Sequence, residues 1–155
     1  MAILNRYCDK VEKASVDEAF LDLTEIAQIE LAQHSEDLEW SAVNNTIIGT
    51  PVESNRITNQ HDKALFMGSY IMQRIRQTIF TELGYTCSAG IANNKTLSKI
   101  ISAMHKPNKQ SILRAESITA FLSTLPFKKI RNLGGKLGKS ISATLPAVET
   151  CNDLL

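Results

Sequence analysis

The sequence predicts an α+β fold in which an antiparallel or mixed sheet, with helices on one face, is followed by a small all-helical segment. Two observations lead to this prediction. Stretches rich in β-compatible residues alternate with helical periodicity up to about residue 106, and the pattern is helical from Ala115 onward. Hydrophobic residues make up 43% of the 155-residue chain, which is enough for a packed core. We therefore expect a sheet domain at residues 1–106 and a helical segment at residues 107–155.

The N-terminal part is predicted to contain a β-hairpin between two helices. Residues 1–9 resemble the end of a helix, and Thr24–Gln33 is a second predicted helix. Residues 11–15 and 19–24 are predicted strands, joined by a turn at residues 16–18.

Residues 34–61 are polar, lack a clear period and are predicted to be a variable loop or insertion. The best helix follows at residues 62–83, and Gly84 is well placed to end it. Its apolar face is expected to consist of Leu65, Met72, Ile75, Ile79 and Leu83.

A strand, a helix and another strand are predicted next. The strand covers residues 86–92, and Asn93 or Asn94 then caps a helix that reaches about Met104. Pro107 disfavours helical structure just before it, and Gln110–Leu113 is a predicted strand. The helical tail is expected in three short pieces, broken at residues 125–126 and 134–135.

Charge is unevenly distributed along this nearly neutral chain, whose net charge is +1. Residues 95–139 hold ten Lys or Arg and one acid, while the remainder holds seven Lys or Arg and fifteen acids. A basic segment of this kind is typical of a protein that binds nucleic acid, and equally of a solvated lysine-rich surface. The three distant cysteines argue against a disulfide framework or zinc site, and the short apolar runs predict a soluble, intracellular protein.

Asp17 and Glu18 form the first candidate site. Adjacent carboxylates on a straight strand point to opposite faces, but at a hairpin turn they can converge. Converging carboxylates beside an open edge suit Mg²⁺, and an ordinary polar turn is the other interpretation.

Three lysines form the second candidate site, on the predicted helix that follows residue 94. Lys95 and Lys99 are four residues apart, and Lys106 lies within roughly 40° of both around a helix. They lie opposite Leu97, Ile100 and Met104 and indicate either a functional basic face or a solvated one. Gly90, just before, permits close approach of a backbone or ligand.

The third candidate site is a basic glycine hairpin at residues 125–139. Its backbone amides and basic side chains are expected to bind a DNA phosphate without reading base sequence, and a plain helix–helix turn is the alternative. The residues concerned are Gly134, Gly135, Lys136, Gly138 and Lys139.

Together these segments resemble the Y-family translesion DNA polymerases. Residues 12–23 are similar to the palm motif with two metal-binding acids, and residues 87–95, with Leu97, Lys99 and residues 106–108 and 110, look like a second signature. Residues 133–138, with the sequence LGGKLG, resemble the eta branch.

The resemblance implies a partial palm at residues 1–106 and the start of a thumb at residues 107–155. Asp17 and Glu18 would be the catalytic, metal-binding acids, Lys106 would contact the nucleotide triphosphate, and Lys95 and Lys99 would support them electrostatically. The implied cofactor is Mg²⁺, with two ions in the intact enzyme and Mn²⁺ as a substitute. The implied partners are primer-template DNA, held through the glycine hairpin, and an incoming deoxynucleoside triphosphate. Membrane association is not expected, and the implied location is nuclear.

Several family features have no counterpart in the sequence. No metal-binding aspartate of a D-x-D-x-F-F-like strand precedes Asp17, and the fingers segment is absent. We therefore expect a fragment that is inactive alone and that can self-associate through an exposed sheet edge. The alternatives are a non-catalytic module that binds DNA through the glycine hairpin, and a purely structural or interaction domain.

Overall fold

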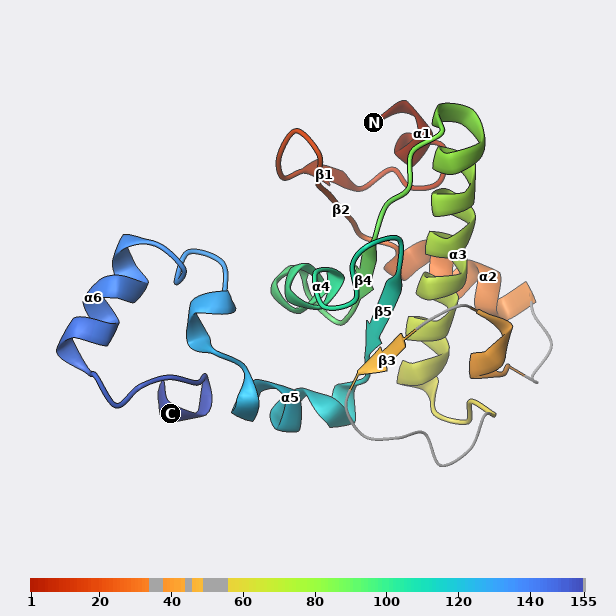
Figure 1. Ribbon diagram of the computed structural model, residues 1–155. Coiled ribbons are helices and arrows are strands. Elements are labelled where there is room, and N and C mark those ends of the chain that lie inside the picture. The colour runs from red at the N-terminus through yellow and green to blue at the C-terminus, as the bar shows by residue number, and fades with distance from the viewer. Residues whose placement is uncertain (34–37, 44–45, 49–55, 155) are drawn as a thin grey trace.

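The computed structural model describes residues 1–33, 38–43, 46–48 and 56–154 (Figure 1). Its helices are α1 (Ala2–Asn5), α2 (Thr24–Gln33), α3 (Gln60–Leu83), α4 (Lys95–Ser102), α5 (Ile118–Thr124) and α6 (Lys136–Thr144). Short 3-10 helices lie at Trp40–Ala42, Ala115–Ser117, Phe127–Lys129 and Asn152–Leu154. The mixed α and β content and the helical C-terminal part confirm the predicted fold class.

The strands form two separate sheets. β1 (Val11–Lys13) and β2 (Ala19–Leu21) pair as an antiparallel hairpin, in which Glu12 lies opposite Phe20. β3 (Thr46–Ile48), β4 (Ala89–Ile91) and β5 (Gln110–Leu113) form a parallel sheet in the order β3-β5-β4. β5 is thus the central strand of this sheet, although it follows residue 106, where the sheet domain was expected to end.

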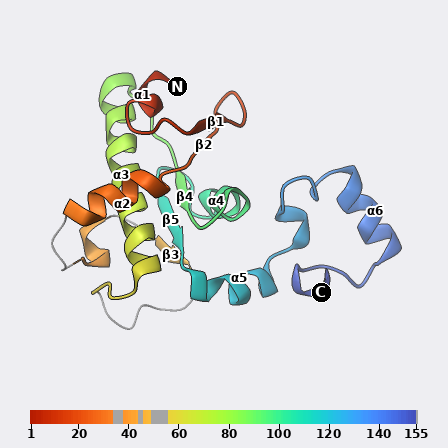
Figure 2. The ribbon, with the colours of Figure 1, turned by 180° about the vertical axis from the view of Figure 1, so that it is seen from behind.

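The parallel sheet is covered on both faces, which corrects the expectation of helices on one face. Successive strand residues point to opposite sides. A Cβ at Gly90 would overlap backbone atoms of α4, whereas the next residue, Ile91, packs against the cluster that holds Leu65 and Phe66 of α3. On β5, Ile112 packs with the α3 residues Leu65 and Phe66, and Leu113 packs with α4. Figures 1 and 2 show α3 and α4 on opposite sides of the sheet.

α3 is capped at both ends, and of these two caps the sequence predicted the one at Gly84. The Asn59 side chain accepts a hydrogen bond from the amide of Asp62 (3.0 Å), and Gly84 ends the helix with a φ of 72°, a conformation that favours glycine. Leu65 and Ile75 are buried as expected. Leu83, in the last turn of α3, is 57% exposed and so does not belong to the buried face.

α4 begins as predicted, with the side chain of Asn94 accepting a hydrogen bond from the amide of Leu97 (2.9 Å). Its apolar residues Leu97, Ile100 and Ile101 are buried. The helix ends at Ser102, so Met104 falls outside it and is 47% exposed rather than part of the apolar stripe.

The predicted loop at residues 34–61 contains regular structure that the sequence pattern did not indicate. The structure describes a 3-10 helix at Trp40–Ala42 and the strand β3, while residues 34–37, 44–45 and 49–55 lie outside the described part of the chain. Trp40 is buried, with its ring edge-on to Phe66 at 6.1 Å between centroids. A three-residue strand is too short to show a period, which explains why the sequence did not reveal it.

The C-terminal segment has the predicted breaks at residues 125–126 and 134–135. Phe121 and Leu125 of this segment join Ile101 of α4 in one apolar cluster, so α5 is attached to the sheet domain. α6 lies on the far side of α4 from α3, as both views of the ribbon show (Figures 1 and 2).

Candidate functional site

The turn between β1 and β2 places Asp17 in solvent. The amides of Ala14 and Ser15 both donate hydrogen bonds to the carbonyl oxygen of Glu18 (2.9 and 3.1 Å), which closes the turn and leaves Val16 97% exposed. The Ser15 hydroxyl donates a hydrogen bond to Oδ1 of Asp17 (2.7 Å). The Asp17 carboxylate is therefore held in place by its own turn.

One face of the hairpin is directed at α4. Glu12 and Glu18 alternate with neighbouring strand residues so that they share a face with Phe20. Lys95 pairs with Glu12, and Lys99 pairs with Glu18. The ammonium of Lys95 also lies 5.8 Å from the centre of the Phe20 ring, a cation–π distance. Two lysines one helical turn apart thus contact two acids of the hairpin.

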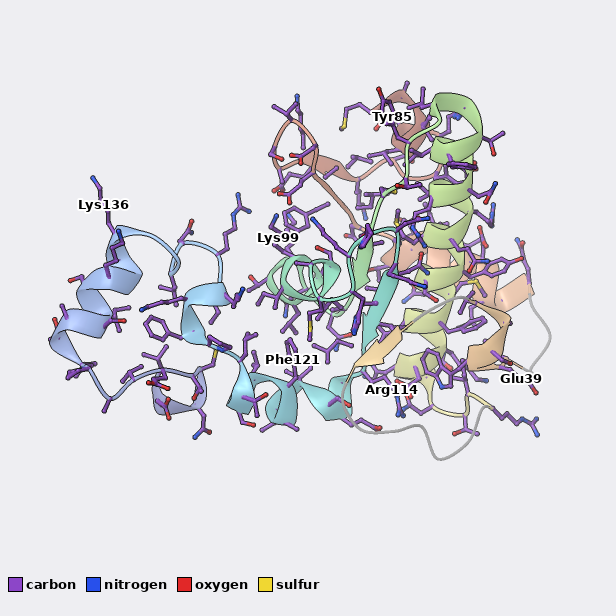
Figure 3. The ribbon with its side chains drawn as sticks, viewed as in Figure 1. Glu39, Tyr85, Lys99, Arg114, Phe121 and Lys136 are labelled. Carbon is purple, nitrogen blue, oxygen red and sulfur yellow. The ribbon has the colours of Figure 1, made fainter. Side chains whose placement is uncertain are left out.

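The position of this lysine pair depends on close contact between α4 and β4. A Cβ at Gly90 would overlap the carbonyl oxygen of Ser98 and crowd the amide of Ser102. The close approach that Gly90 permits is therefore that of the α4 backbone. This contact places Lys99, which directly follows Ser98, beside the hairpin (Figure 3).

The electrostatic surroundings of the hairpin acids are positive. The hydrogen bond from Ser15 is the main cause that lowers the pKa of Asp17, and the charges of Lys106 and Lys99 lower it further. The pKa of Glu12 is lowered by its hydrogen bond and charge interaction with Lys95, with a smaller contribution from Arg131. Lys106 lies beyond the end of α4, in the turn before β5, and still acts on Asp17.

The structure thus brings Glu18 and Lys99 into contact next to Asp17, while Lys106 acts on Asp17 only through its charge. Lys95 lies beside them but pairs with Glu12. No group of three His, Cys, Asp or Glu side chains that could hold a metal ion occurs among the described residues.

The two carboxylates of the turn fit the chemistry of a magnesium ion. Mg²⁺ binds hard oxygen atoms, commonly one or two carboxylates together with waters and substrate phosphates. Asp17 offers an exposed carboxylate, and Glu18 is half-buried with one oxygen in contact with Lys99. These residues can therefore supply part of a metal site, in which substrate phosphates and water would provide the other oxygen ligands.

The glycine hairpin lies apart from these carboxylates. α6 begins at Lys136, and its first backbone bond in the turn runs from the amide of Lys139 to the carbonyl of Gly135 (3.1 Å). The amides of Lys136 and Leu137 precede that bond, and both residues are exposed. Figure 3 shows Lys136 on the side of the molecule away from Lys99 and the sheet.

Of the glycines in this hairpin, Gly138 has a clear packing role. A Cβ there would overlap the carbonyl oxygen of Leu133, so only glycine lets the first turn of α6 lie against the preceding loop. Gly134 and Gly135 are exposed, and a Cβ at Gly135 would meet no other atom.

Ser15 and Glu12 are site residues to which the sequence analysis gave no role. The spacing Ser-x-Asp is a known pattern for a hydroxyl that bonds within a turn, so it could have indicated Ser15. The role of Glu12 follows only from the register that places it opposite Phe20.

None of the helices in the described part of the chain has the length and hydropathy needed to cross a membrane.

Comparison with known proteins gave consistent matches. A model of the impB/mucB/samB family matches residues 1–103. The chain is similar to DNA polymerase eta of Arabidopsis thaliana, with 36% identity over 163 residues that cover 94% of this chain and 24% of the relative. DNA polymerase eta of Drosophila melanogaster is 34% identical over 175 residues, which cover 92% of this chain and 20% of that protein.

A bacterial protein also matches: DNA polymerase IV of Legionella pneumophila (strain Paris) is 33% identical over 153 residues, which cover 99% of this chain and 33% of that protein. The chain therefore spans only a fifth to a third of the length of these curated relatives.

Proposed function

Because the chain belongs to the impB/mucB/samB family of Y-family DNA polymerases, we propose that it forms part of the nucleotidyl-transfer site of a DNA-directed DNA polymerase acting in translesion synthesis. The observation that carries this proposal is the hairpin turn, where Glu18 pairs with Lys99 and the neighbouring Asp17 is exposed, with the charge of Lys106 acting on it. Carboxylates that bind a metal, next to lysines that bind phosphate, are the parts that nucleotidyl transfer requires.

Each residue of the turn has a distinct part in this proposal. Asp17 and Glu18 would hold the divalent metal that Y-family polymerases require, and we propose that this metal is Mg²⁺, with Mn²⁺ as a substitute. When bound, such ions lower the pKa of the primer hydroxyl and neutralise charge on the triphosphate. Ser15 keeps the Asp17 carboxylate in position, since its hydroxyl donates a hydrogen bond to Oδ1 of that carboxylate.

The lysines of the site act on phosphate. Lys106 is exposed and its charge lowers the pKa of Asp17, and we propose that its ammonium contacts the triphosphate of the incoming nucleotide. Lys95 and Lys99 fix the hairpin against α4 through Glu12 and Glu18. The substrates proposed on this basis are primer-template DNA and a deoxynucleoside triphosphate.

The glycine hairpin is proposed to hold the DNA backbone. The exposed amides at the start of α6, with Lys136 and Lys139 beside them, match the donors and charge that a phosphate group requires. Gly134 and Gly135 keep the approach to these amides free of side chains, and Gly138 fixes the first turn of the helix.

The domain division and the location are proposed as follows. Residues 1–106 form the palm part and residues 107–155 the thumb part, with β5 returning to the palm sheet. A nuclear location is proposed because two of the matched relatives come from a plant and an insect. A bacterial protein also matches, so the proposal applies only if the source is a eukaryote. β4 pairs only with β5 within the described residues, and its other edge is where we propose that copies associate.

Metal binding tests the proposed function directly. Binding of Mn²⁺, followed by electron paramagnetic resonance, should be saturable for the chain and weakened at least about tenfold by Asp17→Ala, which removes one carboxylate ligand. Asp9→Ala is the matched control, because Asp9 is another exposed acid of the same N-terminal segment. Equal binding by the Asp17→Ala variant and the unchanged chain would refute the proposed metal site.

A second candidate function is that of a non-catalytic module that binds the DNA backbone. The separation of the glycine hairpin from the carboxylates favours it, because the amides of α6 need no contribution from the turn. Primer extension with Mn²⁺ and all four nucleotides, measured beside Mn²⁺ binding and DNA binding, separates the two functions. Because the chain is expected to be inactive alone, no extension is the expected result, and Mn²⁺ binding that depends on Asp17 then supports the polymerase site. DNA binding without any dependence on Asp17 or on metal supports the module.

A further inference from the structure

The two ion pairs between the hairpin and α4 differ in the acid that each lysine contacts. Lys95 pairs with Glu12, an acid on β1. Lys99 pairs with Oε1 of Glu18, an acid of the proposed metal site. The side chains of Lys99 and Glu18 are 38% and 36% exposed, less than those of the outer pair, so water screens the inner pair less.

Resting on the proposed function, we propose that Lys99 is a positioning residue that holds Glu18 when no divalent ion is present and is displaced from it when one binds. An ammonium and a divalent cation in contact with the same carboxylate oxygen repel each other, so the two cations compete for Glu18. After displacement, the Lys99 ammonium lies beside the metal site with its charge available to an anionic ligand of the metal.

The structure supplies the parts that such an exchange needs. The backbone of α4 is fixed by the Asn94 cap and by its close contact with Gly90, so it stays in place when Lys99 changes partner. The lysine side chain is a flexible four-carbon stem that carries a compact charge, which allows the ammonium to move without the helix. Asp17 remains oriented by Ser15 throughout and does not depend on Lys99 for its position.

Lys95 provides a control because it shares its charge, helix and hairpin contact with Lys99, although its side chain is more exposed. It has the same charge, lies on the same helix one turn away and contacts the same face of the hairpin. It differs in its partner, Glu12, which is not a proposed metal ligand. A general electrostatic effect of α4 would therefore act through both lysines, whereas exchange at Glu18 involves Lys99 alone.

The test measures Mn²⁺ affinity by electron paramagnetic resonance in the unchanged chain and in single variants. Lys99→Met should tighten Mn²⁺ binding about three- to fivefold, the factor expected for removing a partly exposed competing ion pair. Lys95→Met should change the affinity by less than about 1.5-fold, because salt screens the more distant charge. Lys99→Arg retains the competing charge and should leave the affinity unchanged.

A second comparison uses the Glu18→Gln background. There Lys99→Met should no longer alter Mn²⁺ affinity, since the shared oxygen has lost its charge, whereas a general field effect on Asp17 would persist. Equal effects of Lys99→Met and Lys95→Met, no effect of Lys99→Met, or no Mn²⁺ binding by any variant would each overturn the exchange. If Asp17→Ala abolishes binding while Lys99→Met has no effect, the proposed function stands and only the exchange is wrong.

Discussion

At the scale of single residues, the most buried ion pair among those of the described residues joins α3 to the segment after β5. Arg114 donates a hydrogen bond from Nε to Oδ2 of Asp62 (2.8 Å), and its Nη2 lies 2.6 Å from the same oxygen. It also pairs with Glu116 (2.6 Å). The Arg114 guanidinium lies 5.9 Å from the Trp40 ring, so it connects three segments that are distant in sequence (Figure 3).

Asp62→Asn should destabilise the chain by roughly 3 kcal/mol, because it leaves the buried charge of Arg114 without its main partner. Urea unfolding measures the change. Glu116→Ala is the control and should cost less than about 1 kcal/mol, since Glu116 is largely exposed. Similar losses of unfolding free energy in the two variants would show that the pair with Asp62 contributes no more stability than the pair with Glu116.

Glu12 offers a pH-dependent prediction at the same scale. Lys95 is the main cause that lowers its pKa below the usual 4.5, so Lys95→Met should move the Glu12 pKa back towards that value. A lowered folded-state pKa means that the stabilisation is present above about pH 4.5 and is lost as the pH falls through the lower, folded-state pKa. Carboxyl NMR titration measures the shift, and an unchanged Glu12 pKa in Lys95→Met would contradict the pairing.

At the scale of elements, α3 buries one face only along part of its length. Ile75 is fully buried with Met67 and Ile71, whereas Leu83, on the predicted apolar face, is exposed. Ile75→Ala should therefore lower the free energy of unfolding by roughly 2–5 kcal/mol, as expected for a core position, and urea unfolding measures this change. Leu83→Ala should cost less than about 0.5 kcal/mol. A comparable cost for both would mean that the last turn of α3 is covered in solution.

The contact between α4 and β4 is the second element-scale feature. Gly90→Ala should destabilise the chain by roughly 3 kcal/mol, because the added Cβ would overlap backbone atoms of α4, which cannot change rotamer as a side chain can. Gly135→Ala is the control, since a Cβ there meets nothing. Heat denaturation should show a lowered Tm for Gly90→Ala alone, and an equal change in both variants would count against this packing.

Much of this element structure could be predicted from the sequence, for reasons that are local. The Asn94 and Gly84 caps act on their own helices, and helical periodicity identifies α3 and the start of α4. The position of β3 and the burial of Trp40 could not be predicted, because both depend on β5 and α3, which lie far along the chain. The same holds for the site: the adjacency of Asp17 and Glu18 is visible in sequence, but the pairing of Glu18 with Lys99 depends on how α4 packs.

At the scale of the whole molecule, the basic glycine hairpin and the carboxylate turn lie in different parts of the structure (Figure 3). Binding to a primer-template duplex should therefore depend on salt through Lys136 and Lys139, independently of Asp17. Replacing both lysines by Gln should lower the slope of log affinity against log salt by about 1.8, since each phosphate contact contributes about 0.9.

Fluorescence anisotropy at several salt concentrations measures this slope. The pair Lys63 and Lys109 is a suitable control, because both lysines lie outside α6. An unchanged slope after loss of Lys136 and Lys139 would show that the DNA phosphates bind elsewhere.

The strand order of the parallel sheet also constrains how the chain acquires its structure during synthesis on the ribosome. β3 and β4 do not pair with each other, and each pairs only with β5 among the described strands. β5 is the last of the three to be translated, so the sheet cannot form until residue 113 has left the exit tunnel. Until then the hairpin and α3 are the elements able to fold early, and closure of the sheet is a late, long-range step of the kind that slows folding.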